Sequence, residues 1–297
     1  MKKIIVRIAE GLGNQLFMYS HAYSLSKKLG YELQIDNTSG YFKTKNRLRN
    51  YELDKFNIST PTCADNDKFD TYPKDFKRKL LKMLDLIKTN KFFYLKKKNN
   101  DKSTAYFDFS NYQFSNKLFT EGYFQTEKYF IDYSKDLKKE LLIKNVYLDN
   151  NNKYIDLLKK SNSVSICIRQ NRYSEGKIKD NKKSNQFTQN TINYIKRSVS
   201  FLKKKIDKPV FFIWSNDFKN LRDYFNEKDF IFIENEKNKS LNDFNLFMHS
   251  KHFIVGPTPF HWWGAWLNQN KDKICLRPKD INPSNNIDFW PKSWISI

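Results

Sequence analysis

The stretch IIVRIAEGLGNQLFMYSHAY, residues 4–23, carries the pattern that decides how the chain begins to fold. Its apolar run ends in Gly11 and Gly13, and apolar residues at roughly helical spacing follow. A strand, a glycine turn and a helix in this order are the context of a dinucleotide-binding fingerprint. Leu16 stands where the third glycine of that fingerprint belongs, although Asp36 ends the next predicted strand, where a ribose-binding acid would lie. The stretch therefore predicts an α/β fold and leaves a dinucleotide loop open at this point.

The composition indicates a globular protein. A chain of 297 residues, of which 39% are hydrophobic and 16% aromatic, is long enough for one large or two moderate domains. We expect no membrane span, because no run of about 18 apolar residues occurs. Arg7 and Glu10 interrupt the first apolar run, which favours a strand over a signal peptide. Cys63, Cys167 and Cys275 are widely spaced, as reduced thiols of a cytoplasmic protein would be.

The chain is strongly basic, with a formal net charge of +22. Its lysines are mixed with asparagines and spread along the chain, so we expect solvated surface and no nucleic-acid partner. A field of this size favours anionic partners such as nucleotide-sugar diphosphates or acidic lipid headgroups. Peripheral association with the anionic inner face of a membrane is the second expectation from the charge. A nucleic-acid-binding protein is retained as an alternative that the salt dependence of binding would reveal.

The second half alternates short apolar strands with helical segments, which predicts a doubly wound parallel sheet. Ligands of such sheets bind at the carboxyl ends of the strands. The predicted strands are 163–169, 209–215, 229–234, 252–256 and 273–278, and the predicted helices are 188–205, 217–225, 241–250 and 259–270.

The first half is less regular after its opening βαβ pattern. Residues 37–115 are polar, aromatic and lysine-rich, with one amphipathic helix near 75–88, and 116–130 reads as ordered again. Asn, Lys and Ser cluster in 148–163, which is typical of a boundary. We therefore predict two α/β domains, 1–155 and 156–297, facing each other across a cleft.

Three predicted strand ends carry candidate ligand-binding residues. Arg169 and Arg172 follow the first strand, and a guanidinium fork suits a diphosphate, although an ion pair is the alternative. Ser215 and Asp217 follow the second, where simple helix capping is the alternative. Thr258 opens a helix whose N-terminal amides would favour an anion.

Weaker patterns lie elsewhere. Trp262 and Trp263 point in different directions on a helix. Packing of both is the favoured interpretation, and one in the core with the other lining the cleft is the alternative. The DND segment 65–67, with two aspartates, lies in a polar loop, and His249 and His252 have no evident third ligand. The sequence therefore predicts no metal site.

Four stretches, in order along the chain, resemble the α-1,2-fucosyltransferases of glycosyltransferase family 11. EGLGNQLFMYS (10–20) is similar to that family's GGLGNQLFQYA, and GYFQTEKYF (122–130) to its GYFQSEKYF. SND (215–217) corresponds to SDD, and PTPFHWWGAWLN (257–268) to NSSFSWWGAWLN. The resemblance covers nearly the whole chain.

The resemblance implies a GT-B-like fold of two Rossmann-like domains, with acceptor groups on the N-terminal domain and the donor on the C-terminal one. It implies GDP-β-L-fucose as the donor substrate, inversion at the anomeric carbon and no required metal or cofactor. It also implies that the GLGNQL loop lies near the reacting sugar instead of a dinucleotide. The residues expected to act in catalysis are Asn14, Arg169 and Glu10, and those expected at the donor are Gly11, Gly13, Gln15, Arg169, Arg172, Ser215, Asp217, Thr258 and Phe260.

One motif departs from the family. Its HIRRGDY appears as CIRQNRY (167–173), so Arg172 replaces the aspartate, and we expect Arg172 to supply the charge of the missing second arginine. Pro257 and Pro259 also replace two polar residues. For the general base, Glu10 and Asp36 stay open as alternatives.

The expected function is transfer of L-fucose to a galactoside hydroxyl of a surface glycan in α-1,2 linkage. The acceptor would be an oligosaccharide or glycolipid. A transferase of the same fold with another nucleotide-sugar donor, or a non-catalytic GDP-sugar- or glycan-binding relative, are the alternatives that the altered motif leaves open.

Overall fold

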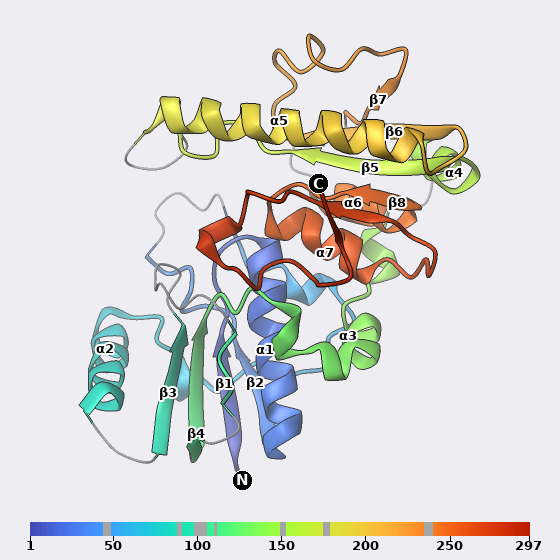
Figure 1. The fold of residues 1–297 in the computed structure, drawn as a ribbon. Coiled ribbons are helices and arrows are strands. Elements are labelled where there is room, and N and C mark those ends of the chain that lie inside the picture. The colour runs from blue at the N-terminus through green and yellow to red at the C-terminus, as the bar shows by residue number, and fades with distance from the viewer. Residues whose placement is uncertain are drawn as a thin grey trace. The chain divides into compact units, whose positions relative to one another are not determined.

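The computed structural model describes residues 1–43, 49–87, 91–97, 106–109, 112–148, 153–174, 179–234 and 240–297. These residues form two compact units, each built on its own parallel sheet (Figure 1). The first unit comprises Met1–Lys144 and Ser284–Pro291, and the second Asn145–Pro283 and Lys292–Ile297. None of the described helices is both long and apolar enough to cross a membrane.

The first unit holds a four-stranded sheet in the order β2-β1-β4-β3. All of its pairs are parallel, and β1 is central between β2 and β4. Helix α1 packs against β1, β2 and β4, and most of its side chains are buried, as expected for a helix covered on several sides. The elements are β1 (Lys3–Arg7), α1 (Leu12–Leu29), β2 (Glu32–Asp36), α2 (Tyr72–Ile87), β3 (Lys91–Lys97), β4 (Gln113–Gly122) and α3 (Ser134–Glu140).

The second unit holds a six-stranded sheet in the order β10-β9-β8-β5-β6-β7, again all parallel. Helix α5 covers one face of this sheet, and α6 and α7 lie on the other (Figure 1). The elements are α4 (Lys153–Lys160), β5 (Asn162–Ile168), α5 (Asn181–Lys203), β6 (Pro209–Ser215), β7 (Phe230–Phe232), α6 (Ser240–His249), β8 (His252–Ile254), α7 (Pro259–Leu267), β9 (Cys275–Arg277) and β10 (Ile295–Ser296).

The boundary between the units differs from the predicted one. The expected division at 155/156 would cut α4, which packs against β5 and α6 of the second unit and begins that unit. The apolar side chains Ile155 and Leu158 are buried and hold the helix there. In addition, Ser284–Pro291 returns to the first unit, where Phe289 lies 6.2 Å from the ring of Phe17. A single cut in the sequence cannot represent such a return.

The predicted helix at 217–225 is a series of turns instead. Leu221 and Phe225 are buried in the core of the second unit, which explains the helix-like apolar spacing. Asn220, however, has a φ of 63°, and this left-handed residue is incompatible with a continuing helix. The apolar pattern was therefore a guide to burial but not to helix formation.

Candidate active site

The sheet of the second unit has a topological switch point at the end of β5. From β5 the chain continues through α5 to β6 and β7 on one side, then returns through β8, β9 and β10 on the other. This is the strand order of a Rossmann fold, in which ligands bind outside the carboxyl ends of the strands where the order reverses. The loops after β5, β6 and β8 are therefore neighbours at this edge of the sheet.

The loop after β8 lies against the end of β5. A Cβ added to Gly256 would come within 2.2 Å of the backbone oxygen of Cys167, so only glycine fits at this position. Burial raises the pKa of the Cys167 thiol to about 12, so it is a neutral packing group at neutral pH. The close approach brings Pro257 and Thr258, which follow Gly256, to the residues that follow β5.

Arg172 links the two loops across the switch point. Its Nη1 donates a hydrogen bond of 3.0 Å to the backbone oxygen of Pro257. Its guanidinium carbon lies 5.1 Å from the ring centre of Phe187, which supports it by a cation–π contact. The pKa of Arg172 is lowered, mainly by burial and in part by the nearby positive charge of Arg169. Two cations thus lie close together at the end of β5, and a bound diphosphate would relieve their repulsion.

Gln170 and Asn171, which depart from the family's motif, hold the loop after β5 in place. Asn171 takes a φ of 58°, a left-handed conformation that asparagine tolerates better than most residues and that the family's glycine adopts freely. The side chain of Gln170 donates to the backbone oxygens of Asp217 and Lys219, and its backbone N–H donates to Asn216 Oδ1 at 2.8 Å. Gln170 and Asn171 therefore fasten the loop after β5 to the loop after β6.

Ser215 and Asp217 mostly hold their own loop together. The Ser215 hydroxyl donates to the backbone oxygen of Asp217 at 2.6 Å, and Asp217 Oδ1 accepts the N–H of Lys219 at 2.9 Å. Asp217 Oδ2 accepts from Asn171 Nδ2 at 3.3 Å. The structure thus places both residues at the predicted edge of the sheet, with internal partners for their side chains.

The start of α7 offers fewer amides than its sequence indicated. Pro259 has no N–H, and Thr258 accepts the N–H groups of both His261 and Trp262. In the part of the chain that the structure describes, the N–H of Phe260 is the first-turn amide that no backbone oxygen accepts. The Phe260 ring packs 5.4 Å from that of Phe244, so its side chain is a packing group.

His261 is a loop-positioning residue that the sequence did not reveal. It is fully buried, its Nδ1 accepts the N–H of Gly256 at 3.0 Å, and its Nε2 lies 2.9 Å from the hydroxyl of Ser165. It therefore ties the loop after β8 to strand β5. The signal was available, since His261 stands where the family's motif has serine.

The neutral state of His261 predicts a pH dependence of stability. Burial lowers its pKa to about 3, whereas an unfolded histidine has a pKa of about 6.5. Below about pH 6.5, His261 therefore binds a proton in the unfolded chain but stays neutral in the folded chain. The free energy of unfolding falls as the pH drops. We expect the wild type to lose about 2 kcal/mol more than His261→Gln between pH 7 and pH 5 in urea unfolding. Parallel losses in both proteins would contradict this role.

The first unit positions the residues of the GLGNQL loop. Gln15 is fully buried, and its amide donates to the backbone oxygens of Glu10 and Asn50 and accepts the N–H of Glu52. Asn14 is partly exposed, and its side-chain oxygen accepts a hydrogen bond of 2.7 Å from Gln125. Gln15 is therefore a positioning residue in this structure, and Asn14 stays the candidate for contact with a substrate.

The two glycines of this loop differ from a dinucleotide fingerprint. Gly11 precedes α1 in an extended conformation, and a Cβ there would meet nothing closer than 3.9 Å. Gly13 is buried in the first turn of α1, and Leu16 is fully buried in the core. Neither the spacing nor the conformation supports a dinucleotide loop.

Glu10 is held in an unusual backbone conformation. Its φ is 68°, in the left-handed region that costs a non-glycine residue about 1–2 kcal/mol. Its carboxylate forms a salt bridge with Arg49 and accepts the hydroxyl of Tyr123 at 3.3 Å, while Tyr41 donates to its backbone oxygen. Backbone strain of this kind is frequent at functional sites, and it persists where the surrounding contacts hold the residue in place.

Asp36, the other carboxylate considered as a base, is fully buried. Its Oδ1 accepts the backbone N–H groups of Thr38 and Ser39 at 3.2 and 3.0 Å. The side chain of Glu10, by contrast, is 37% exposed. Of the two, Glu10 is the carboxylate that a substrate can reach.

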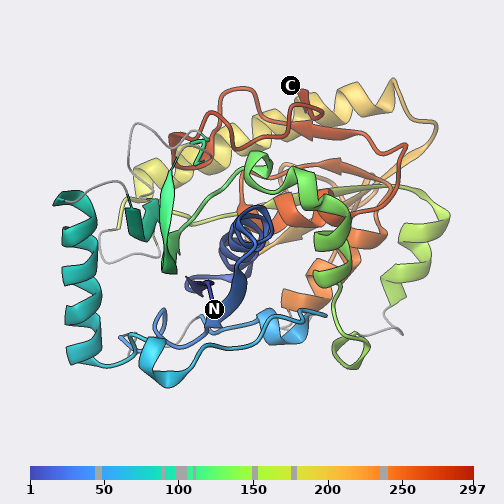
Figure 2. The same cartoon turned by 90° about the horizontal axis from the view of Figure 1, so that it is seen from below.

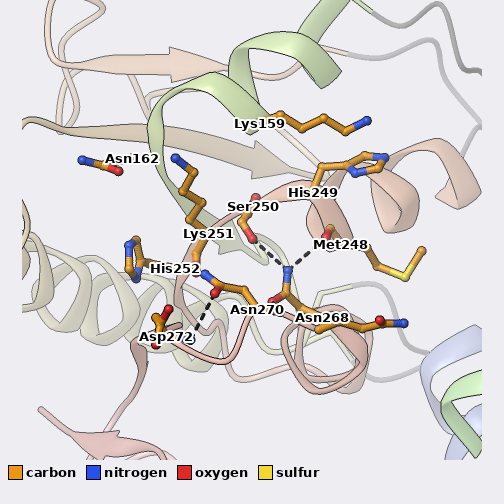
Figure 3. A pocket seen from close by; sticks show the side chains of 11 residues that line it. Lys159, Asn162, Met248, His249, Ser250, Lys251, His252, Asn268, Asn270 and Asp272 are labelled. Carbon is orange, nitrogen blue, oxygen red and sulfur yellow. Dashed lines mark hydrogen bonds between the residues drawn. The ribbon is translucent and has the colours of Figure 1, made fainter.

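The remaining patterns fall elsewhere. Trp262 and Trp263 are both fully buried, so the favoured interpretation of packing is confirmed for both and the cleft alternative is not. His249 and His252 line an open hollow at the amino end of β8, away from the strand ends that carry ligands (Figure 3). Burial and a nearby lysine lower the pKa of each. Among the described residues, no group of three or more His, Cys, Asp or Glu side chains is placed to hold a metal ion.

The segment Asp65–Asp67, with its two aspartates, is a short 3-10 helix with a structural role. Asp67 is almost buried, and its carboxylate pairs with Lys3 at 2.6 Å and with Lys117. Burial alone would raise the pKa of Asp67, but the two lysines hold it below its usual value. Asp65 is 89% exposed and pairs with Lys68.

Replacement of Asp67 should therefore affect stability. We expect Asp67→Ala to lower the free energy of unfolding by about 1–3 kcal/mol, less than the loss of a fully buried pair because Lys117 reaches solvent. Asp65→Ala is the matched control and should leave the urea midpoint nearly unchanged. Equal effects of the two substitutions would contradict this assignment.

The sequence model of Glycosyl transferase family 11 matches residues 3–297. The chain is 28% identical to an Alpha-1,2-colitosyltransferase of Escherichia coli over 305 residues, covering 100% of this chain and 99% of that protein. It is 27% identical to the O-antigen biosynthesis glycosyltransferase WbnK of Escherichia coli, covering 98% of this chain and 99% of the other.

Two solved structures share the fold. FUT1 of Arabidopsis thaliana, solved as a mutant in complex with GDP, aligns with a TM-score of 0.54 and 14% identity over 94% of this chain and 71% of that one. The fucosyltransferase NodZ from Bradyrhizobium aligns with a TM-score of 0.51 and 13% identity over 89% of this chain and 92% of that one. The two Rossmann-like units are thus a GT-B-like architecture, and the chain belongs to glycosyl transferase family 11.

Proposed function

We propose that the protein is an inverting glycosyltransferase that transfers L-fucose from GDP-β-L-fucose to a galactoside hydroxyl in α-1,2 linkage. The observation that carries the proposal is the hydrogen bond from Arg172 to Pro257 across the switch point, with Arg169 in the same loop and close enough to lower the pKa of Arg172. A diphosphate at this edge of the sheet would meet two guanidinium groups, which bind phosphate oxygens as planar forks.

The second unit would bind the donor. As the bond to the sugar breaks, negative charge develops on the leaving GDP, and fixed cations at that place stabilise the transition state. In our proposal Arg169 and Arg172 supply these cations, and the N–H of Phe260 at the start of α7 adds one hydrogen bond to the phosphate. Ser215, Asp217 and His261 would support the three loops that position them.

The first unit would act on the acceptor. The acceptor hydroxyl has to lose its proton as it attacks the sugar, which needs a base within hydrogen-bond reach. We assign this role to Glu10, and we assign orientation of the sugar or of the acceptor to Asn14. The family's motif has glycine at position 10, so the base would be particular to this chain. It would compensate for the aspartate that Arg172 replaces.

A donor screen tests this function. Hydrolysis or transfer is measured with GDP-fucose, GDP-mannose, activated colitose and UDP-sugars, each with magnesium, manganese or chelator. We expect GDP-fucose to be turned over without added metal, and GDP to raise the melting temperature more than UDP or NAD. Loss of turnover in chelator with rescue by manganese would show that a metal is required.

The alternative donor is supported by one observation. The relative that is 28% identical is named as a colitosyltransferase, and residues 170–172 depart from the motif of the fucosyltransferases. Preference for activated colitose over GDP-fucose in the screen would establish this alternative. Thermal stabilisation by GDP without turnover of any donor would indicate a non-catalytic binding protein.

A further inference from the structure

Helix α2 packs against the sheet of the first unit through charged residues. Arg78 and Lys82 both pair with Glu121 of β4, and the Arg78 side chain also binds Asp75 of the same helix. The hydroxyl of Tyr94, on β3, donates to Glu121 at 2.6 Å. The face of the helix toward the sheet is thus an ionic cluster.

The opposite charges of this ionic cluster compensate one another. Burial alone would raise the pKa of Glu121, but Lys82 and Arg7 lower it to about 2. The side chains of Asp75, Arg78 and Lys82 are only 3%, 12% and 16% exposed. The charged face of α2 is therefore the face that the folded unit covers.

The apolar face of α2 points the other way. Tyr72, Phe76, Leu80 and Met83 are 76%, 66%, 44% and 59% exposed. Positions three and four apart lie on one face of a helix, so the four side chains form a continuous stripe. Soluble helices turn such a stripe toward the core, and α2 does the opposite. In both Figure 1 and Figure 2, α2 lies on the outer side of β3, at the rim of its unit.

Basic side chains border this stripe. At about 100° per residue, Lys77 and Lys79 fall on opposite flanks of it, and both are exposed, although Lys79 Nζ also lies 3.7 Å from Asp75 Oδ2. Lys43 pairs with Asp75, is 44% exposed and lies over the rings of Phe42 and Tyr72 at 5.2 and 5.9 Å. An apolar stripe between lysines is the pattern of a helix that lies in the interface of an anionic membrane.

We propose that the exposed face of α2 docks on an anionic membrane surface. The four apolar side chains would enter the boundary between headgroups and acyl chains, and Lys43, Lys77 and Lys79 would bind the headgroups. The charge argues against a second copy as the occupant, because two such lysine-flanked faces on chains of net charge +22 would repel each other. This inference does not depend on the identity of the donor sugar.

Flotation of the full-length protein with vesicles tests the proposal. We expect binding to phosphatidylcholine vesicles that contain phosphatidylglycerol, and little binding to phosphatidylcholine alone. The triple variant Phe76→Ser, Leu80→Ser, Met83→Ser should reduce the bound fraction by about tenfold or more. Val146→Ser, which removes an apolar side chain that is 81% exposed in the second unit, is the matched control and should bind like the wild type.

The lysines are tested separately. Lys77→Glu with Lys79→Glu should weaken binding strongly, whereas Lys228→Glu with Lys271→Glu, an equal change of charge at exposed positions of the second unit, should weaken it far less. Circular dichroism and an unchanged melting temperature confirm that each variant is folded. Equal losses in the two charge variants, undiminished binding by the serine variant, or a dimer that only the serine variant abolishes would overturn the proposal.

Discussion

Glu10→Gly is expected to lower turnover by about 10²–10⁴-fold while the protein stays at least as stable as the wild type. The loss follows from removal of the proposed base. The retained stability follows from the φ of 68° at Glu10, which glycine adopts without strain. The two measurements are kcat from donor turnover and the free energy of unfolding in urea.

Glu10→Gln separates charge from backbone strain. It keeps the shape of the side chain and the strained conformation, so it should lose turnover as Glu10→Gly does without gaining stability. Tyr123→Phe removes only the 3.3 Å hydrogen bond to the carboxylate and should have a much smaller effect on kcat. If Glu10→Gly retained wild-type turnover, the base would have to be another group, and Glu10 would be a strained residue without a catalytic role.

Arg169→Ala is expected to lower kcat/KM by about tenfold to a few hundredfold. A hydrogen bond to a charged group contributes about 1.5–3 kcal/mol, and each 1.4 kcal/mol corresponds to about a factor of ten in rate. Lysine should restore only part of the loss, because it cannot bind two oxygens as a planar fork. Arg172→Ala should have a comparable effect and should also loosen the loop at Pro257.

Arg222→Ala is the control for these two arginines. It removes the same charge from the second unit, where Arg222 is exposed and pairs with Glu227 and Glu234. It should leave kcat/KM close to that of the wild type. If Arg172→Ala left both GDP affinity and turnover unchanged, Arg172 would not compensate for the missing arginine, and the altered motif would indicate a changed function.

Much of the fold could be predicted because the strands of a parallel sheet are short and apolar and are separated by helices and polar loops. The predicted segments at 209–215 and 252–256 contain β6 and β8, since buried strands read as continuous apolar runs. The boundary at 144/145 and the return of Ser284–Pro291 could not be predicted, because they depend on contacts between segments that are distant in the sequence.

The candidate site could be predicted by location but not by the role of each side chain. Arg172 and Thr258 lie at the expected strand ends because strand order fixes where loops meet. The internal bonds of Gln15 and the bridging position of His261 depend on backbone groups that the sequence does not display. The orientation of α2 illustrates the same limit. Its amphipathic period predicted a helix, but Glu121, far along the chain, decides which face is buried.

A crystal structure of the complex with GDP tests the central claim most directly. The measured quantities are the distances from the diphosphate oxygens to the guanidinium groups of Arg169 and Arg172 and to the backbone of Phe260. We predict hydrogen-bond distances to both arginines at the switch point between β5 and β8. A diphosphate bound instead at the Gly11–Gly13 loop of the first unit, with both arginines free of it, would contradict the account.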